Sequence, residues 1–434
     1  MSTTTNASLQ QRKEAATPRG VGVMCGFYID RAKNAELWDI EGRRYIDFAG
    51  GIGVLNTGHL NDKVAAAVAA QAEKFSHTCY QVVPYELYVS VAEKLNAITP
   101  GDHAKKTAFF TTGAEAVENA IKVARAYTKR SGVIAFGGAF HGRTMMAMTL
   151  TSKVGYKMGC GPFAPEVYRL PYPDYYRYGK GMDINTFSDS YIRELEAFFH
   201  TNVPADQVAA IILEPVQGEG GFMPIPKKYL QSLREVCTKY GIMLILDEVQ
   251  SGFGRTGKWA AYQHYDVVPD ISTWAKSMGS GMPIGCVMGR AEIMDACKPS
   301  TIGGTYPGNP VCCAAAIATL DYMHAIDINA LGEKVGNITR SRFQEMQSTY
   351  PCIGDVRGLG AMMAFELVKN NDPFQPDGEL CKQLIAYCAA KGLVVISAGV
   401  NGNIIRVLSP LVIEETLLRK GLDIIENGLR ELTQ

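Results

Sequence analysis

The sequence lacks an excess of charge of either sign: 43 Lys and Arg residues are balanced by 43 Asp and Glu residues. Proteins that bind nucleic acids or anionic membrane surfaces usually present a basic surface. No segment approaches the roughly 20 consecutive apolar residues that a membrane-spanning helix requires. The chain is therefore expected to have neither a nucleic-acid nor a membrane partner.

The sequence also lacks a regular cysteine pattern. Its 11 cysteines are scattered, odd in number and without a Cys-x-x-Cys pair. A disulfide framework or a zinc site would show regular spacing, so we expect reduced thiols and no metal. Residues 1–17 are polar and rich in threonine, without the apolar segment of a signal peptide. The expected location is the cytoplasm.

Short apolar runs alternate with longer amphipathic patterns along the first three quarters of the chain. Helices are predicted over Glu115–Lys129 and Pro226–Tyr240. This alternation predicts an α/β fold with a mainly parallel central sheet covered on both faces. The predicted buried strands are Thr107–Thr111, Gly132–Phe136, Val208–Leu213, Ile242–Asp247, Asp270–Trp274 and Ile284–Met288.

The pattern changes near residue 310 and predicts a smaller α+β domain. Its expected helices are Val311–Ala325, Leu331–Gln347 and Ile413–Leu429, and its expected strands are Gly354–Leu367, Leu393–Ser397 and Ile404–Leu408. Within Phe27–Ile52 we predict a hairpin that belongs with this domain. The expected division is an N-terminal segment 1–60 packing with the small domain, a large domain 61–325 and a small domain 326–434.

Two side chains of opposite charge are expected where strands of this sheet end. Lys276 follows Asp270–Trp274 and precedes a turn of small residues, and Asp247 ends the run Ile242–Asp247. Ligands of open α/β sheets bind beyond the carboxyl ends of the strands. A lysine that forms a Schiff base and an aspartate that pairs with a pyridinium nitrogen are the two poles of a pyridoxal phosphate site. The alternatives are a solvated loop lysine and an aspartate that caps a turn.

Further motifs follow other predicted strands. Thr111–Ala116, with Gly113, opens a helix whose first N–H groups could bind an anion, although a plain N-cap at Thr112 is the better explanation of this motif taken alone. In Phe140-His141-Gly142-Arg143 the aromatic ring could stack on a flat heterocycle, and the guanidinium suits a carboxylate. A surface arginine and a core phenylalanine are the alternative for this motif.

Three more segments offer polar groups near this site. Glu214 begins Glu-Pro-Val-Gln-Gly-Glu-Gly-Gly and, as a carboxylate at a buried strand end, needs a partner, for which Arg143 and Arg406 are the candidates. After Asp247, Val249 could pack on the ring face opposite Phe140 and Gln250 could bond near the ring hydroxyl. The loop Gly303–Pro310 carries Thr305, whose hydroxyl could reach a phosphate; a plain loop is the alternative.

Together these motifs resemble, in order and over nearly the whole chain, the class III aminotransferases of fold type I. Within that class the segments Phe48–His59, Ser76–Gln81 and Val356–Met362 are most similar to bacterial 4-aminobutyrate aminotransferases. The resemblance implies pyridoxal phosphate as cofactor and transamination between 4-aminobutyrate and 2-oxoglutarate. It also implies a homodimer with shared active sites, or a tetramer built from such dimers.

The resemblance further implies a role for each site residue. Lys276 and Asp247 would be catalytic, and Glu214 would gate Arg406. The remaining cofactor contacts would come from Gly113, Ala114, Phe140, His141, Val249, Gln250 and the neighbouring subunit's copy of Thr305, and the substrate contacts from Ile52, Gln81, Arg143, Glu214 and Arg406. Ala114 stands where many relatives have serine, and Phe140 often appears as tyrosine.

Other activities remain open on these residues. The same fold could act on 5-aminovalerate, β-alanine or ornithine, because one methylene changes discrimination by only about 1–3 kcal/mol. A decarboxylase or racemase is a second alternative, since a fold does not fix a reaction. A non-catalytic binding protein is a third. Two arginines favour an acceptor with two carboxylates, and an intact Lys276–Asp247 pair favours catalysis.

Overall fold

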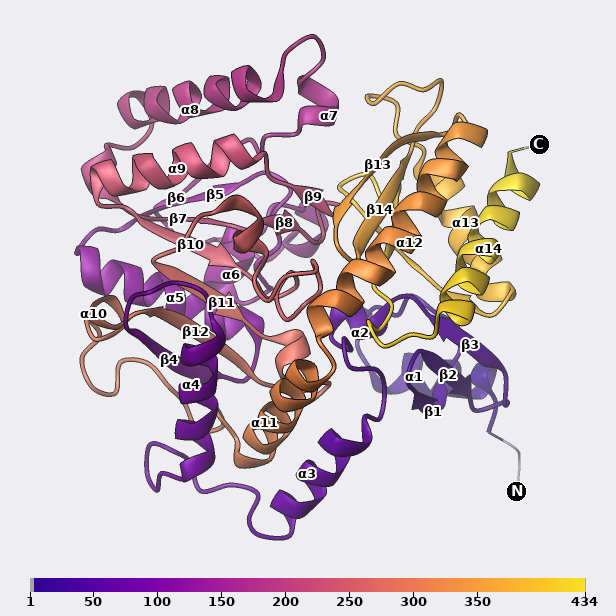
Figure 1. The fold of residues 1–434 in the computed structure, drawn as a ribbon, viewed down its shortest axis with the longest axis horizontal. Coiled ribbons are helices and arrows are strands. Elements are labelled where there is room, and N and C mark those ends of the chain that lie inside the picture. The colour runs from indigo at the N-terminus through magenta and orange to yellow at the C-terminus, as the bar shows by residue number, and fades with distance from the viewer. Residues whose placement is uncertain (1–3, 434) are drawn as a thin grey trace.

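A seven-stranded sheet forms the centre of the molecule (Figure 1). The structure, a computed structural model, describes residues 4–433. The strands from β11 to β6 run parallel, and β12 is antiparallel to both neighbours, so the sheet is mainly parallel, as predicted. The order is β4 (Lys105–Phe110), β12 (Gly285–Arg290), β11 (Ile271–Trp274), β10 (Met243–Asp247), β7 (Val208–Leu213), β5 (Gly132–Phe136) and β6 (Val167–Leu170).

Helices cover both faces of this sheet, which explains why its strands are apolar on both sides. In β5, Val133 belongs to one buried cluster and Ile134 to another, because successive side chains point to opposite faces. Helix α5 (Gly113–Thr128) packs in the first cluster through Val117 and Ile121. Helices α8 (Ile184–Thr201) and α9 (Lys227–Tyr240) cover the other face (Figure 1).

A second, antiparallel sheet lies in the C-terminal part of the chain. Its order is β13 (Ile353–Leu359), β14 (Met362–Leu367), β17 (Ile404–Val407) and β16 (Ile396–Ala398). The run predicted as strand over Gly354–Leu367 is thus a hairpin, turning at Gly360 with φ +50°. Helices α12 (Ile328–Thr349), α13 (Gly378–Ala390) and α14 (Glu415–Leu432) flank this sheet (Figure 1). Helix α13 is absent from our sequence-based predictions.

The N-terminal hairpin is confirmed and lies beside this C-terminal part. Strands β1 (Ile29–Lys33), β2 (Glu36–Asp39) and β3 (Arg44–Asp47) form an antiparallel sheet, and β3 pairs in parallel with β15 (Leu393–Val394). Residues far apart in sequence therefore share one sheet. Helix α1 (Asn6–Ala16) lies against it, with Asn6 Nδ2 donating to Asp39 Oδ2 at 3.0 Å.

The remaining elements connect these parts. The helices α3 (Asp62–Ala72) and α4 (Glu86–Ile98) pack on α11 (Pro310–Ala325). Within the described chain no single helix is long and apolar enough to cross a membrane, although α11 and α12 pass that test as a pair bent by 69°. The short elements are α2 (Gly50–Gly53), α6 (Met145–Leu150), α7 (Tyr175–Tyr178), α10 (Ala291–Met294), β8 (Val216–Gln217) and β9 (Met223–Pro224).

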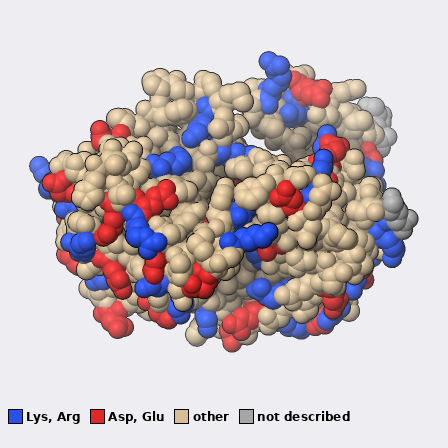
Figure 2. All heavy atoms as spheres, turned by 90° about the horizontal axis from the view of Figure 1, so that it is seen from above, with Lys and Arg blue, Asp and Glu red and all other residues tan. Residues whose placement is uncertain are grey.

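The surface and the thiols agree with the composition. On the face shown in Figure 2, acidic and basic side chains are interspersed rather than gathered by sign, as expected for a chain of zero net charge. All 11 cysteines are free, and nine of them lie in the buried apolar clusters or pack against them. Most of the thiols therefore serve as small apolar packing groups.

Candidate active site

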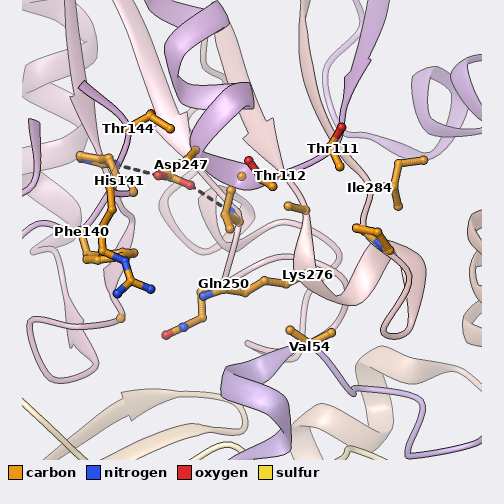
Figure 3. Close-up of a pocket in the computed structure, with 18 of the residues that line it drawn as sticks. Val54, Thr111, Thr112, Phe140, His141, Thr144, Asp247, Gln250, Lys276 and Ile284 are labelled. Atoms are coloured by element: carbon orange, nitrogen blue, oxygen red, sulfur yellow. Dashed lines mark hydrogen bonds and ion pairs between the residues drawn. The ribbon is translucent and has the colours of Figure 1, made fainter. Parts of the chain in front are cut away.

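A cavity of about 600 Å³ opens beyond the carboxyl ends of β10 and β11 and the start of α5. This volume suits a small organic ligand. Lys276 and Asp247 both line it, as do residues that follow β5 and β7. Figure 3 shows Lys276, Gln250 and Asp247 around the same space, and Phe140 and His141 at one side of it. Residues from five separate segments are thus assembled at one edge of the sheet, as the strand-end argument predicts.

Lys276 is held in an uncommon backbone conformation. It opens a 3₁₀ turn, Lys276–Gly279, with φ +46°, a left-handed value that costs a non-glycine residue about 1 kcal/mol or more. The turn is fixed by Ser277 Oγ, which donates to the carbonyl of Gly53 at 3.1 Å. Burial lowers the pKa of the Lys276 amine to about 8, with Glu219 opposing that shift. A sizeable neutral fraction is therefore present near neutral pH, as a lysine that acts as nucleophile or base requires.

The Asp247 carboxylate is fixed by two donors. Its Oδ1 accepts from the backbone N–H of Val249 at 3.0 Å, and its Oδ2 lies 2.7 Å from His141 Nδ1 (dashed in Figure 3). An ionised carboxylate can only accept, so Nδ1 carries the proton of this pair. His141 is itself buried, with its backbone N–H donating to Thr151 Oγ1. His141 thus orients the aspartate and also lines the cavity.

The start of α5 offers two backbone donors to the cavity. Thr112 is the N-cap and forms a capping box with Glu115, as the plain-cap alternative predicted. The N–H groups of Gly113 and Ala114 remain without a partner inside the helix, and both residues line the cavity. Glycine is needed at position 113 because Val249 packs closely against its backbone, and not because of a turn: a Cβ there would lie 2.9 Å from Val249 Cγ1. The cap and the anion site are therefore compatible functions of one motif.

These residues fit pyridoxal phosphate, the expected cofactor. The two free amides and the helix dipole suit a phosphate. Asp247 suits a protonated ring nitrogen, and Phe140 and Val249 line the same cavity as apolar walls. Gln250, packed against Gly218, has a buried Oε1 without a hydrogen-bond partner among the described residues, as a ligand hydroxyl would require.

The expectation that Glu214 pairs with Arg143 or Arg406 is wrong. Its Oε2 accepts from the Phe140 N–H at 3.0 Å and its Oε1 from the Gly218 N–H at 2.9 Å. Both oxygens are thus turned toward backbone donors at the β5 and β7 ends. Burial raises the pKa of Glu214 to about 7, opposed by His141 and reinforced by Asp247.

Arg406 pairs instead with Glu219, five residues further along the same motif. The distance from Arg406 Nη2 to Glu219 Oε1 is 2.6 Å, and Arg406 Nη1 donates to the carbonyl of Gly218 at 3.2 Å. Arg406 is 1% exposed, and Glu219 lines the cavity whereas Arg406 does not. Burial raises the pKa of Glu219, but Arg406, Lys276 and Tyr156 together lower it below its usual value, so the carboxylate is ionised at neutral pH. Glu219 therefore covers a buried cation next to the cavity.

Three other residues predicted for the site also do not line the cavity of this chain: Gln81, Thr305 and Ile52. Gln81 is exposed and donates to the carbonyl of Ile302, in the segment that leads to the exposed Thr305. Ile52 is 40% exposed and has φ +63°, a strained value for a β-branched residue. The remaining predicted residues, Gly113, Ala114, Phe140, His141, Arg143, Glu214, Asp247, Val249, Gln250 and Lys276, all line the cavity.

Sequence reasoning missed Glu219 and the cavity residues Val54 and Met282. Glu219 had a signal, since it is the second carboxylate of the Glu214 motif and is flanked by glycines. Val54 and Met282 had no such signal, because nothing in their local sequence distinguishes them from core or loop residues.

Glu214 gives the stability of the protein a pH dependence. The pKa of its carboxyl is raised from 4.5 to about 7 by folding, so the stability it contributes is present below about pH 4.5 and is lost as pH rises through 7. The shift corresponds to about 3 kcal/mol. We expect Glu214→Gln to gain stability relative to the parent by up to that amount between pH 5 and pH 8, measured as the free energy of unfolding in denaturant.

Glu93→Gln, on the exposed face of α4, is the matched control and should change stability by less than about 0.5 kcal/mol at either pH. A Glu214→Gln difference that is the same at pH 5 and pH 8 would contradict the raised pKa.

Comparison with known proteins agrees with this geometry. A family model described as aminotransferase class-III matches residues 16–429. The chain is 47% identical to the probable 4-aminobutyrate aminotransferase of Bacillus subtilis, over 98% of each chain. It is 48% identical to the 5-aminovalerate aminotransferase DavT of Pseudomonas putida, over 99% of each chain.

A solved structure extends the likeness to the whole fold. The taurine:2-oxoglutarate aminotransferase from Bifidobacterium kashiwanohense, in complex with pyridoxal phosphate and glutamate, matches with a TM-score of 0.91 and 26% identity, covering 99% of each chain. The chain therefore belongs to the class III aminotransferases, and pyridoxal phosphate is its cofactor.

Proposed function

We propose that this enzyme transfers the amino group of 4-aminobutyrate to 2-oxoglutarate, giving succinate semialdehyde and glutamate. The observation that carries the proposal is the pair Arg406–Glu219 beside a cavity that Arg143 also lines. The site thus has two cations: Arg143, which is always accessible from the cavity, and Arg406, which is covered by the Glu219 carboxylate. The identity to a 4-aminobutyrate aminotransferase over 98% of the chain supports the same donor.

The two substrates differ by one carboxylate. In 4-aminobutyrate and in glutamate, two methylenes separate the amine-bearing carbon from a carboxylate. Arg143 binds this distal group in both half-reactions, because its planar fork suits a carboxylate. Only glutamate and 2-oxoglutarate carry a second carboxylate next to the reacting carbon. Arg406 binds that second group.

Glu219 makes one site suit both substrates. With 4-aminobutyrate bound, Glu219 stays on Arg406, since an unpaired buried guanidinium would cost about 3–5 kcal/mol. When 2-oxoglutarate arrives, its second carboxylate takes the place of Glu219. The gating role that we expected of Glu214 thus moves to Glu219, whose carboxylate is the one in contact with Arg406.

Lys276 carries the proton transfer. When bound, pyridoxal phosphate supplies a ring that withdraws electrons from the carbon attached to the substrate nitrogen. Lys276 Nζ, with its pKa lowered to about 8, takes the proton from that carbon. Asp247, oriented by His141, would hold the ring nitrogen protonated. Phe140 and Val249, which line the cavity, would pack against the ring and exclude water from it.

A second candidate donor is 5-aminovalerate. The 48% identity to the Pseudomonas putida enzyme is as high as that to the 4-aminobutyrate enzyme. The two donors differ by one methylene, a difference that a pocket discriminates by only about 1–3 kcal/mol.

We propose that two copies of the chain complete each site. Val82, Val83 and Tyr306 are 74%, 55% and 65% exposed and lie in the two segments joined by the contact between Gln81 and Ile302. Apolar side chains exposed together are typical of protein interfaces. In a dimer this region brings Thr305 to the partner's phosphate and Ile52 to a buried position.

The donor is tested by half-reaction kinetics. We expect kcat/KM for 4-aminobutyrate to exceed that for 5-aminovalerate, β-alanine and ornithine by about tenfold or more, because 4-aminobutyrate has the same two-methylene spacing to its carboxylate as glutamate, which Arg143 must also bind. Bleaching of the cofactor absorbance reports each half-reaction. A higher value for 5-aminovalerate would instead support the second candidate.

The gate is tested by Glu219→Gln, which removes the charge and keeps the shape. In this variant the charge of Arg406 has no negative partner when 4-aminobutyrate is bound, whereas 2-oxoglutarate supplies one. We therefore expect kcat/KM for 4-aminobutyrate to fall by about 10- to 100-fold, and kcat/KM for 2-oxoglutarate to fall by less than about threefold. Glu214→Gln is the comparison variant and should not separate the two half-reactions. Equal losses in both half-reactions of Glu219→Gln would exclude the gate.

The assembly is tested by sedimentation velocity. The holoenzyme should sediment as a dimer or a larger even-numbered species at micromolar concentration. We expect Val82→Asp, which places a charge in the apolar surface, to shift it toward monomer and weaken cofactor retention. Asp substitution at Val154, exposed but in a different segment, is the control. A parent enzyme that sediments as a fully active monomer would contradict shared sites.

A further inference from the structure

Tyr156 links the gate to the rest of the active site without lining the cavity itself. It ends the 3₁₀ turn Val154–Tyr156, after α6, and is partly buried. Its hydroxyl lies 3.1 Å from Glu219 Oε2, the oxygen that does not contact Arg406. The two oxygens of Glu219 are therefore held by two different residues, one charged and one neutral.

The ring of Tyr156 is positioned by the residues expected to hold cofactor and substrate. It packs edge-on against Phe140, with 5.1 Å between ring centroids. The guanidinium carbon of Arg143 lies over its face, 5.7 Å from the centroid, and Lys153 Nζ lies 5.8 Å from it. Its location is thus defined from several sides, and the hydroxyl direction is fixed with it.

The hydroxyl is the donor in its contact with Glu219. Burial, the Glu219 charge and the hydrogen bond to Glu219 all raise the pKa of Tyr156, opposed by Arg406 and Arg143. The phenol therefore stays protonated at neutral pH, and an ionised carboxylate can only accept. A hydrogen bond to a charged acceptor is stronger than one between neutral groups.

We propose that Tyr156 is a positioning residue for substrate choice, a latch whose hydroxyl holds Glu219 on Arg406 and sets how readily a second carboxylate can displace it. The backbone supports the same geometry, since the Glu219 carbonyl accepts from the Gly399 N–H at 2.9 Å. The Glu219 main chain is thereby fixed, and the side chain has to move on its own. Opening then breaks two contacts of this carboxylate, one to Arg406 and one to Tyr156.

The latch has a thermodynamic consequence. A dicarboxylate binds only the open form, so its apparent affinity is reduced by the fraction of enzyme that is open. A monocarboxylate leaves Glu219 in place and does not bear this cost. Removing the hydroxyl should raise the open fraction by about threefold to tenfold, the range for one hydrogen bond to a charged group that water can partly replace. This inference rests on the proposed function only in assigning Arg406 to the second carboxylate.

Tyr156→Phe tests the latch, because it deletes the hydroxyl and keeps the ring between Phe140 and Arg143. Glutarate and butyrate are the probes: they match 2-oxoglutarate and 4-aminobutyrate in chain length and carboxylates but cannot react. We expect calorimetric titration of the holoenzyme to show glutarate binding about threefold to tenfold more tightly in Tyr156→Phe. Butyrate affinity should change by less than about twofold.

Two further variants separate a latch from general loosening. Tyr168→Phe removes a similar hydroxyl that donates to Glu166 at 2.9 Å on β6, outside the site, and should leave the glutarate-to-butyrate ratio unchanged. Glu219→Ala leaves the hydroxyl no carboxylate to hold. If the hydroxyl acts through the Glu219 carboxylate, adding Tyr156→Phe to Glu219→Ala should change the glutarate-to-butyrate affinity ratio by less than about twofold.

Three outcomes would overturn the latch: an unchanged ratio in Tyr156→Phe, a ratio shifted toward butyrate, or the same shift with and without the Glu219 carboxylate. These outcomes are separate from a failure of the proposed function. An enzyme that does not turn over 4-aminobutyrate, but whose glutarate affinity responds to Tyr156→Phe, would lose the proposed donor and keep the latch. An enzyme that turns over 4-aminobutyrate, but whose glutarate-to-butyrate affinity ratio is unchanged in Tyr156→Phe, would keep the proposed donor and lose the latch.

Discussion

The buried guanidinium of Arg406 needs a negative partner at every stage of the reaction, and this requirement determines how the substrates can bind. Desolvating a charge costs several kcal/mol unless a well-placed partner compensates it. In the structure that partner is Glu219, at 2.6 Å. A substrate with one carboxylate must leave the pair intact, and a substrate with two can replace it. In the mechanism that we propose, dual specificity follows from keeping one charge compensated, without two separate binding sites.

The sheet brings this pair to the catalytic residues. Strands β7 and β10 run parallel and in neighbouring positions, so Glu219, which follows β7, and Asp247, which ends β10, emerge at the same edge. Lys276 follows β11, the next strand. Arg406 comes from the other sheet, on β17, and reaches the edge from the C-terminal part of the chain. The site therefore depends on how the seven-stranded sheet and the C-terminal sheet pack together, because this packing brings Arg406 to Glu219, which lies far from it in sequence.

The sequence was sufficient to predict the parts of the site that depend on strand ends. Lys276, Asp247 and Gly113 lie at such positions, and apolar runs buried on both faces locate the strands closely. The partner of Arg406 was not predictable in this way. Glu214 and Glu219 share one glycine-rich motif, and only the fold of that loop decides which carboxylate turns toward backbone N–H groups and which toward Arg406. Helix α13 was missed because its buried face, with Cys381, Leu384 and Cys388, is narrow and interrupted by polar residues.

The gate also acts on the base that moves the proton. Glu219 raises the pKa of Lys276 and Arg406 lowers it, so the two charges of the pair act on that amine in opposite directions. If Glu219 moved away with nothing in its place, Arg406 would depress the pKa of Lys276 further. A second substrate carboxylate on Arg406 restores the missing negative charge as it displaces Glu219. In the mechanism that we propose, the exchange of one carboxylate for another therefore keeps a negative charge near Lys276 in both half-reactions, which favours a single proton carrier for two substrates.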